Sequence, residues 1–377
     1  MSQKGEFMQR RRRWFLVPAL LVAIASLVVA GFASAGSSGQ KATKVTLQLK
    51  WVAQAQFAGF YAAKSKNFYK QAGLDVNLKL GGPDISPEQV VLGKQAEFGI
   101  DWLPSLLAQR DTGANLVNIA QVYARSGTTE VVWRDSGIKS IKQMKGKKYG
   151  VWILGNEFEQ QAALVKAGLD PKKDVTLVKQ NFDMVAFLKR QIDAASAMTY
   201  NELAQVLEAK NPKTGKLYKL SDLRVFKMSD LGTGMLQDGV FVRGDWIRNK
   251  ANQATAVKFL TASLKGWIYC RDHYKACVNI VLANGPALPR GHQTWQMNEV
   301  NALIWPNKLG IGVMSPVDYA KTAKISLTYK VIKKPAAKAS YRTDLARKAV
   351  ANLRKQGVDV KGNRWKKAVV VLKEKGK

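Results

Sequence analysis

The chain has 377 residues, and 60 Lys and Arg against 27 Asp and Glu give it a formal net charge of +33. Two His and two Cys are too few for a zinc array or a disulfide-rich scaffold, and an apolar fraction of 46% with ten Trp is too high for a disordered chain. The length suits two globular domains, and the charge raises the question of a nucleic-acid or other polyanionic partner.

The first 35 residues have the three parts of an export signal. Four Arg at 10–13 precede an apolar run over 14–30, and Ala33-Ser34-Ala35 supplies small residues for cleavage. We expect a signal peptide at 1–35, a linker at 36–43 and an extracytoplasmic protein, which argues against nucleic acid as the partner. The apolar run is also close to the ~18–20 residues of a membrane span, so an uncleaved anchor is the alternative.

Strand and helix patterns alternate along most of the chain. In the first series, strands are expected at 45–51, 76–80, 98–100 and 116–123, and helices at 58–72, 86–94 and 103–110. In a second series, strands are expected at 130–133, 149–153, 175–179 and 195–199, and helices at 158–169, 184–191 and 201–209. A returning strand at 239–243 precedes helices at 257–268, 274–282, 295–304 and 317–326.

This alternation indicates an α/β protein with two lobes. Residues 44–128 and 234–330 would form the first lobe and 129–233 the second, while the basic extension 331–377 would pack on or beyond the first lobe. Ligands of open α/β sheets bind at the carboxyl ends of strands, so the cleft between the lobes is the expected site.

Aromatic and polar side chains gather at those strand ends. The candidates are Trp51, Gln54, Gln56, Phe57, Tyr61, Asp101, Trp102, Asn156, Glu157, Tyr200, Asn201 and Asp238. Aromatic rings stack on planar ligands, and amides both donate to and accept from ring nitrogens. Structural roles are the alternative: the rings could cap a sheet, Asp101 and Asn156 could cap helices, and Asp238 could lie in a solvated turn.

The cysteines and histidines lie in the helical second half. Cys270 and Cys277 would be about 10 Å apart in one straight helix, but 271–274 resembles a break between helices, so both a disulfide and two free thiols are open. His273 and His292 are expected far from the strand ends. No motif for hydrolytic catalysis or metal binding is visible.

Several segments carry a family resemblance. LQLKWVAQAQFAGFYAAKSKNFYKQAGLDV, GGPD, QAEFGIDW, KGKKYGVW, GNEFEQQAALVKAGLD and DAASAMTYNELAQVLE resemble the substrate-binding family related to thiamine pyrimidine synthase, over roughly residues 44–330. The resemblance implies a two-lobed type II periplasmic-binding-protein fold. Its members include solute-binding proteins of ABC importers for thiamine pyrimidine precursors, and related proteins resemble riboflavin, sulfonate or taurine binders.

The synthases of this family are the enzymatic alternative. They use a Lys for pyridoxal phosphate and a His four residues later, and the corresponding positions here are Asp101 and Ser105. Their Cys-rich stretch corresponds roughly to residues 236–242, which hold no Cys. A Schiff base needs an amine, so the resemblance argues against synthase chemistry and we expect no cofactor.

The sequence therefore predicts a monomeric solute-binding protein of an ABC importer rather than an enzyme. Its ligand would be a flat heteroaromatic nutrient, a thiamine pyrimidine precursor first and riboflavin second, with a sulfonate or taurine as the alternative. Trp51, Phe57 and Tyr61 would line the ring, Gln54, Gln56, Asp101 and Asn201 would contact polar edges, and Asn156 and Glu157 would close from the second lobe. Expected partners are permease subunits and, through the basic surface, envelope polyanions.

Overall fold

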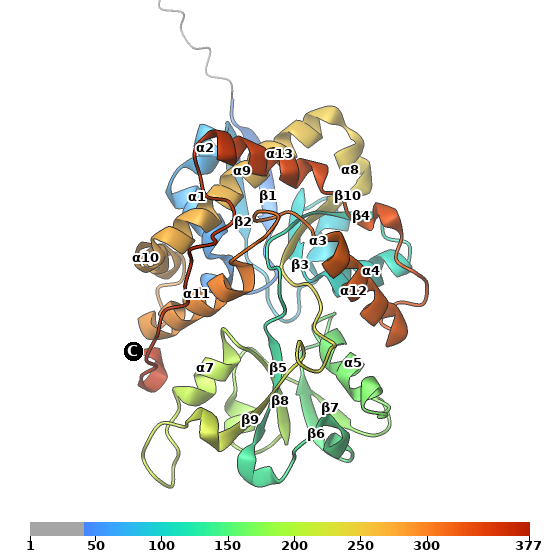
Figure 1. The fold of residues 1–377 in the computed structure, drawn as a ribbon, viewed down its shortest axis with the longest axis vertical. Helices are drawn as coiled ribbons and strands as arrows, with labels where there is room; N and C mark the ends of the chain where they lie inside the picture. The colour runs from blue at the N-terminus through green and yellow to red at the C-terminus, as the bar shows by residue number, and fades with distance from the viewer. Residues whose placement is uncertain (1–40) are drawn as a thin grey trace, which may run out of the picture. The chain divides into compact units, whose positions relative to one another are not determined.

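The computed structural model describes residues 41–377 (Figure 1). The expected signal peptide and most of the linker lie outside the described residues. Within 41–377, no helix combines the length and the hydrophobicity that crossing a membrane requires.

The first sheet has the strand order β2-β1-β3-β10-β4. Its strands are β1 (Thr43–Gln48), β2 (Leu74–Lys79), β3 (Phe98–Asp101), β4 (Leu116–Gln121) and β10 (Gly239–Arg243). β1 pairs in parallel with β2 and β3, whereas β10 lies antiparallel between β3 and β4. This sheet and the helices packed on it are the first lobe.

The helices of the first lobe come from both of its chain segments, before and after the second lobe. They are α1 (Ala58–Ser65), α2 (Phe68–Gln71), α3 (Pro87–Leu92), α4 (Leu103–Asp111), α8 (Gly244–Arg248), α9 (Lys250–Asp272), α10 (Tyr274–Asn284), α11 (Arg290–Ile304), α12 (Pro316–Thr328) and α13 (Asp344–Lys355). Ser86 caps α3 as expected, because its side chain accepts from the backbone N–H of Gln89. The single helix expected at 58–72 is wrong: Asn67 has a left-handed φ of 59° that separates α1 from α2.

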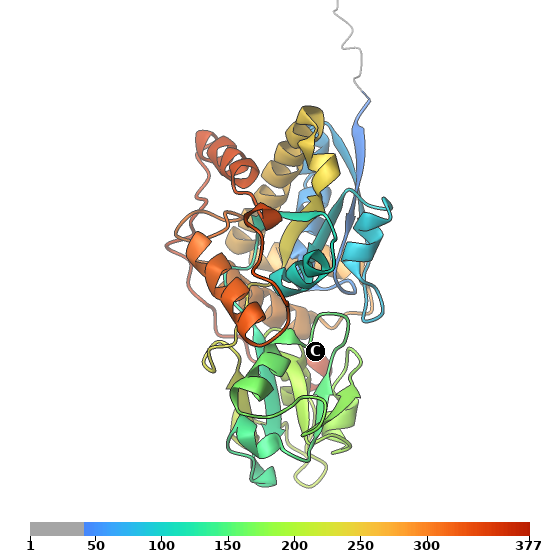
Figure 2. The ribbon, with the colours of Figure 1, turned by 90° about the vertical axis from the view of Figure 1, so that its right-hand side faces the viewer.

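The second sheet has the order β7-β6-β8-β5-β9. Its strands are β5 (Thr128–Trp133), β6 (Lys148–Val151), β7 (Thr176–Lys179), β8 (Ala194–Met198) and β9 (Leu223–Lys227), and its helices are α5 (Phe158–Lys166), α6 (Val185–Leu188) and α7 (Glu202–Leu207). We call this sheet and its helices the second lobe, and Figures 1 and 2 show its strands grouped apart from those of the first. β9 was not expected from the sequence, and it lies at the edge of its sheet.

Two chain segments, 122–127 and 228–238, connect the lobes. They lie side by side: Val122 N donates to Asp238 O (3.2 Å), and Gly127 N donates to the side-chain Oε1 of Gln237 (2.9 Å). The fully buried Gln237 also donates from Nε2 to Glu159 Oε1 (2.8 Å) on α5. One amide therefore binds both the neighbouring connection and the first helix of the second lobe.

Arg125, on the first connection, holds the end of α11. Its guanidinium donates to the carbonyl oxygens of Leu303 (3.4 Å), Trp305 (3.3 Å) and Pro306 (2.9 Å). A cation is favourable here because the carboxyl end of a helix presents carbonyl groups without partners and the negative end of the helix dipole. The carboxyl end of α11 is thereby fixed to a segment that joins the lobes.

A disulfide and the basic extension complete the first lobe. Cys270 in α9 and Cys277 in α10 form a disulfide with their Cα atoms 5.1 Å apart, across the helix break at His273. Leu345, Ala349 and Leu353 of α13 are fully buried in the core that α9 shares. The chain then runs along α11 and ends where the two lobes meet (Figures 1 and 2).

Close packing of α1 against α9 generates a prediction about stability. A Cβ atom at Gly266 would lie 2.0 Å from the backbone O of Gly59, and one at Gly59 would lie 2.2 Å from the ring of Trp267. Gly266→Ala should therefore lower the free energy of unfolding by about 2 kcal/mol, measured by urea titration. At the control position Gly82, a Cβ meets nothing within 4 Å. If Gly266→Ala and Gly82→Ala unfold at the same urea concentration, the close packing of α1 against α9 does not have the expected effect on stability.

Candidate functional site: a cleft between the two lobes

A cavity lies where the carboxyl ends of strands from both sheets face each other. From the first lobe it is lined by Lys50, Trp51, Gln54, Gln56 and Trp102, and from the second by Trp152, Asn156, Met198, Tyr200, Asn201 and Glu202. Its volume is about 20 Å³, which is room for one water molecule. A larger ligand therefore needs the lobes to separate before it enters.

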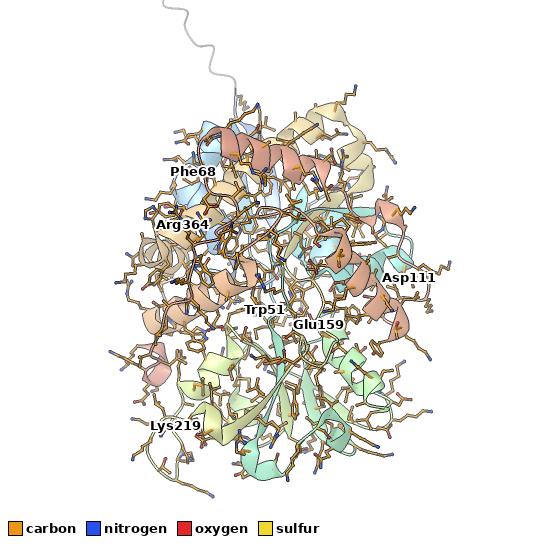
Figure 3. All side chains as sticks on the ribbon, in the orientation of Figure 1. Trp51, Phe68, Asp111, Glu159, Lys219 and Arg364 are labelled. Carbon is orange, nitrogen blue, oxygen red and sulfur yellow. A yellow bond between two sulfur atoms is a disulfide. The ribbon has the colours of Figure 1, made fainter. Side chains whose placement is uncertain are left out.

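A wider groove of about 410 Å³ adjoins this cavity and forms its mouth. The two share Trp51, Gln54 and Asn201. Phe182, Gln205, Glu208, Leu288, His292 and Lys375 are among the other residues that line the mouth. Figure 3 labels Trp51 and Glu159, and both lie in the region where the two sheets meet.

Aromatic rings from opposite lobes meet edge to face beside the cavity. The ring centroids of Trp51 and Trp152 are 6.4 Å apart with an interplanar angle of 70°. Trp152 Nε1 donates to the carbonyl oxygen of Asn181 (2.8 Å), which fixes the ring on the second lobe. Because each ring belongs to a different lobe, their separation depends on how far the cleft is closed.

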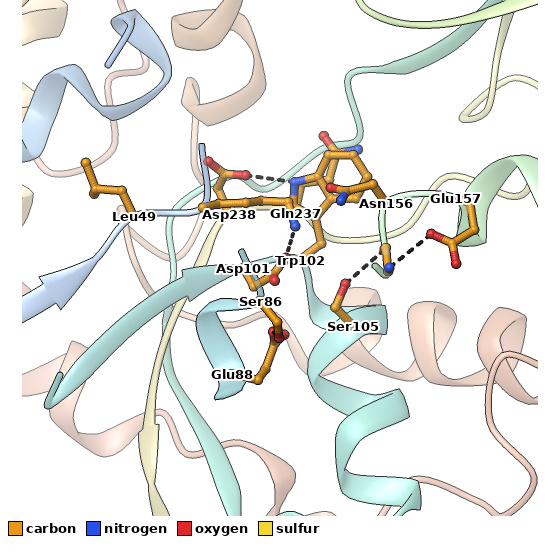
Figure 4. A network of polar contacts seen from close by, with 12 residues as sticks. Leu49, Ser86, Glu88, Asp101, Trp102, Ser105, Asn156, Glu157, Gln237 and Asp238 are labelled. Carbon is orange, nitrogen blue, oxygen red and sulfur yellow. Dashed lines mark hydrogen bonds and ion pairs between the residues drawn. The ribbon is translucent and has the colours of Figure 1, made fainter. Parts of the chain in front are cut away.

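Asp238 holds two lining side chains of the first lobe in place. It accepts from Trp102 Nε1 (2.9 Å) and from Gln56 Nε2 (2.9 Å), and Figure 4 shows the bond from Trp102. Gln56 in turn accepts from Gln54 Nε2 (2.6 Å). Burial raises the pKa of Asp238 to about 6, while these hydrogen bonds oppose that shift. Asp238 thus orients the wall of the cavity from behind it.

Among the residues that the structure describes, Lys50 is the one cation that lines the cavity, and its charge is balanced by Asp101. Its Nζ is bound to Asp101 Oδ1 and lies 4.8 Å from the centre of the Trp102 ring. Glu88 lies behind this pair, only 2% exposed. Burial, and then the charge of Asp101, raise the pKa of Glu88 well above its ordinary value. The ion pair of Lys50 with Asp101 presents no net charge to the cavity.

The second lobe contributes the turn between β8 and α7. Glu202 accepts from the backbone N–H of Met198 (2.9 Å) and from Asn201 Nδ2 (2.6 Å). Burial raises the pKa of Glu202 to about 7. Asn156, on the loop after β6, donates to the carbonyl oxygen of Ile153 (2.8 Å), which fixes its amide beside the cavity.

Not all the residues expected at the site line it. Those that do are Trp51, Gln54, Gln56, Trp102, Asn156, Tyr200 and Asn201. Asp101 and Asp238 lie directly behind lining side chains, and Glu157 accepts from Gly155 N (3.0 Å) on the loop shown in Figure 4. Phe57 and Tyr61 pack in the core of the first lobe instead.

Four lining residues were not among the candidates: Lys50, Trp152, Met198 and Glu202. Trp152 directly follows β6 and Lys50 follows β1, so the strand-end criterion would have included both. The expectation that His292 lies far from the strand ends is wrong. Its Nε2 is 2.8 Å from Asn201 Oδ1, because the first turns of α11 lie against the second lobe.

Burial of Glu202 generates a prediction about pH. With a pKa of 4.5 when unfolded and about 7 when folded, this group makes the folded protein bind more protons between those values. Stability from this group is therefore present below about pH 4.5 and lost as the pH rises to about 7. In Glu202→Gln, the fall in unfolding free energy from pH 5 to pH 7.5 should shrink by about 2 kcal/mol, measured by urea titration at both values.

The control for this experiment is the exposed Asp75 on β2. Asp75→Asn should keep the pH dependence of the unchanged protein. If Glu202→Gln also keeps it, the carboxyl of Glu202 is not the buried group described above.

Comparisons with known proteins agree with this architecture. A thiamine biosynthesis protein of Haemophilus influenzae, so named, is 27% identical over 155 residues, which are 40% of this chain and 48% of that protein. The 4-amino-5-hydroxymethyl-2-methylpyrimidine phosphate synthase THI11 of Saccharomyces cerevisiae is 25% identical over 232 residues, 60% of this chain and 66% of the synthase. The chain thus spans about half to two thirds of the length of these curated relatives.

The fold is also found among solved structures. The alkanesulfonate-binding protein SsuA of Xanthomonas axonopodis pv. citri, bound to MOPS, superposes with a TM-score of 0.59 at 14% identity, over 80% of this chain and 98% of that one. This likeness confirms the expected two-lobed type II periplasmic-binding-protein fold. The NMT1/THI5-like family profile matches residues 54–276. Since that match covers more than half of the chain, the protein belongs to the NMT1/THI5-like family.

Proposed function

We propose that this protein is the extracytoplasmic solute-binding component of an ABC importer and takes a flat heteroaromatic nutrient between its lobes. A thiamine pyrimidine precursor is the first choice and riboflavin the second. The observation that carries the proposal is the pair formed by Trp51 and Trp152, one from each lobe, at a single cavity. A planar ligand that separates the two rings contacts both of them only while the lobes stay close to each other, so binding favours closure onto the ligand.

The charge of the cavity favours a neutral or amino-bearing ligand over a sulfonate. Lys50 is neutralised by Asp101, and Glu202 adds a carboxyl to the opposite wall. An anion would therefore meet no unpaired cation among the lining residues. The amides of Gln54, Asn156 and Asn201 can instead exchange hydrogen bonds with the nitrogens of a heterocycle and its amino group.

The size of the cavity favours one ring over three. Its closed volume is small, and a single pyrimidine ring needs less separation of Trp51 and Trp152 than a flavin does. The printed names of the Haemophilus influenzae and Saccharomyces cerevisiae relatives, which concern thiamine biosynthesis and a pyrimidine phosphate, point to the same ligand class.

We also propose binding without catalysis. Among the described residues that line the cavity, Lys50 is the one amine, and its side chain is already engaged with Asp101 rather than free to attack a carbonyl group. In this proposal the protein is a monomer outside the cytoplasm. A permease recognises its closed form. The basic surface, including the +12 of 331–377, would meet anionic envelope polymers.

A thermal-shift panel tests the ligand class. The aminopyrimidine should raise the melting temperature, because ligand at about 100 times its Kd adds about 2.7 kcal/mol to stability. Trp152→Ala should weaken pyrimidine binding about 10- to 100-fold, whereas the control Trp365→Ala, which changes a partly buried ring of the extension that lines neither the cavity nor its mouth, should not. A shift with taurine or an alkanesulfonate, and none with any heterocycle, would overturn the proposal.

Asp101→Asn tests why anions are excluded. The variant leaves Lys50 without its counter-charge, so alkanesulfonate affinity measured by calorimetry should rise about tenfold. Glu88→Gln is the control, because it keeps the Lys50–Asp101 pair and should leave sulfonate affinity unchanged. Equal sulfonate affinity in Asp101→Asn and the unchanged protein would show that charge balance does not set the selectivity.

Absorbance with pyridoxal phosphate separates binding from synthase chemistry. We expect no lysine-linked aldimine band in the purified protein. A band that disappears in Lys50→Arg would establish the enzymatic alternative.

A further inference from the structure

We propose that residues 367–377, here called the C-terminal strap, tie the two lobes together at the mouth of the cleft and slow the release of ligand. The proposal rests on the proposed function for the identity of the ligand. The tie itself is visible in the contacts of the strap, which begin on the first lobe and, from Leu372 onward, reach the second lobe while Gly376 lies against the first turn of α11.

The start of the strap is anchored to α11 of the first lobe. Ala368 and Asn298 exchange two hydrogen bonds, from Ala368 N to Asn298 Oδ1 (2.9 Å) and from Asn298 Nδ2 to Ala368 O (2.8 Å). Beside them, Lys367 forms an ion pair with Glu299, whose side chain is only 9% exposed. This reciprocal pairing fixes the backbone of the strap to the helix.

The end of the strap is anchored to the second lobe. Leu372 packs against the apolar cluster that contains Leu207 and Tyr218. Lys375 N donates to the carbonyl oxygen of Glu208 (3.1 Å), just after α7, and Glu374 forms an ion pair with Lys210 (2.6 Å). Residues 372–375 are thus held on the second lobe by an apolar contact, a backbone hydrogen bond and an ion pair.

Between these two anchors the backbone of the strap is already extended. Val369 and Val371 are 95% and 77% exposed, whereas Val370 and Leu372 are half-buried. This alternation is typical of extended chain, which cannot lengthen much further. The lobes therefore cannot separate far unless the strap leaves one of them.

His292 connects the strap to the cavity through the same glutamate. Its Nδ1 lies 3.0 Å from both carboxylate oxygens of Glu208, and its Nε2 lies 2.8 Å from Asn201 Oδ1. Asn201 uses its Nδ2 to donate to Glu202, so its Oδ1 is free to accept from Nε2 of His292. His292 comes from the first lobe and is buried, so it is a positioning residue for Asn201 in the closed form.

Truncation after residue 366 tests the strap. Removing it should speed dissociation of the aminopyrimidine about tenfold in stopped-flow measurements and change the association rate much less. The matched control is Val369→Ser with Val371→Ser, which alters only exposed side chains and should keep the original rate. An unchanged dissociation rate in the truncated protein would overturn the proposal.

Two further measurements keep the test decisive. Lys375→Pro removes the N–H that binds Glu208 and cannot adopt the φ of 55° at this position, so it should release the end of the strap and speed dissociation several-fold even if the truncated chain folds poorly. Hydrogen exchange across residues 200–210, measured without ligand, should be faster in both variants. If the aminopyrimidine fails to bind the full chain, the proposed function fails, whereas unchanged exchange in both variants would refute the strap.

His292 is tested by variants that differ in one donor. His292→Ala should speed dissociation about tenfold, and His292→Gln, which keeps one donor toward Asn201, should recover part of the loss. When His292→Ala is combined with the truncation, the increase in dissociation rate should be smaller than the product of the two separate increases, because both changes act through Glu208. Equal rates for the Ala and Gln variants, or full multiplicativity, would refute the positioning role.

Discussion

The hydrogen bonds of one buried amide determine how the two lobes face each other. Gln237 lies on one connection between the lobes, accepts from Gly127 on the other, and donates to Glu159 on α5. Loss of any of these bonds would leave a polar group unpaired in the interior, which costs about 1–3 kcal/mol. The cleft depends on this arrangement, because Trp51 and Trp152 meet only when both sheets present their carboxyl ends to the same space.

Several buried acids also lie around the cleft. Glu88, Glu202 and Asp238 are each at most 3% exposed, and burial raises the pKa of all three. An interior optimised only for stability would replace such groups with apolar ones. Their gathering around one cavity, where Asp238 orients Trp102 and Gln56 and Glu202 orients Asn201, is the pattern expected of a binding site rather than of a core.

Much of this architecture could be predicted from the sequence. Alternating strands and helices indicated the fold class, and the strand-end criterion found several lining residues. It placed Phe57 and Tyr61 at the site because sequence distance from a strand does not show which way a helix turns its side chains. β9 was not predicted because its five residues, LRVFK, are too short a run for their apolar pattern to distinguish a strand from other structure. The contact of His292 with Asn201 joins residues 91 positions apart, and no local pattern encodes it.

α11 can be considered as a lever. Arg125 fixes its carboxyl end to a connection between the lobes, while His292, near its other end, contacts the second lobe. A helix of 15 residues is about 22 Å long, so a rotation of about 10° at the fulcrum moves the far end by about 4 Å. That displacement exceeds the reach of any hydrogen bond at His292 while hardly disturbing Arg125. A rotation of this size would therefore break the contact between His292 and Asn201 while the carboxyl end of α11 stays attached to the connection.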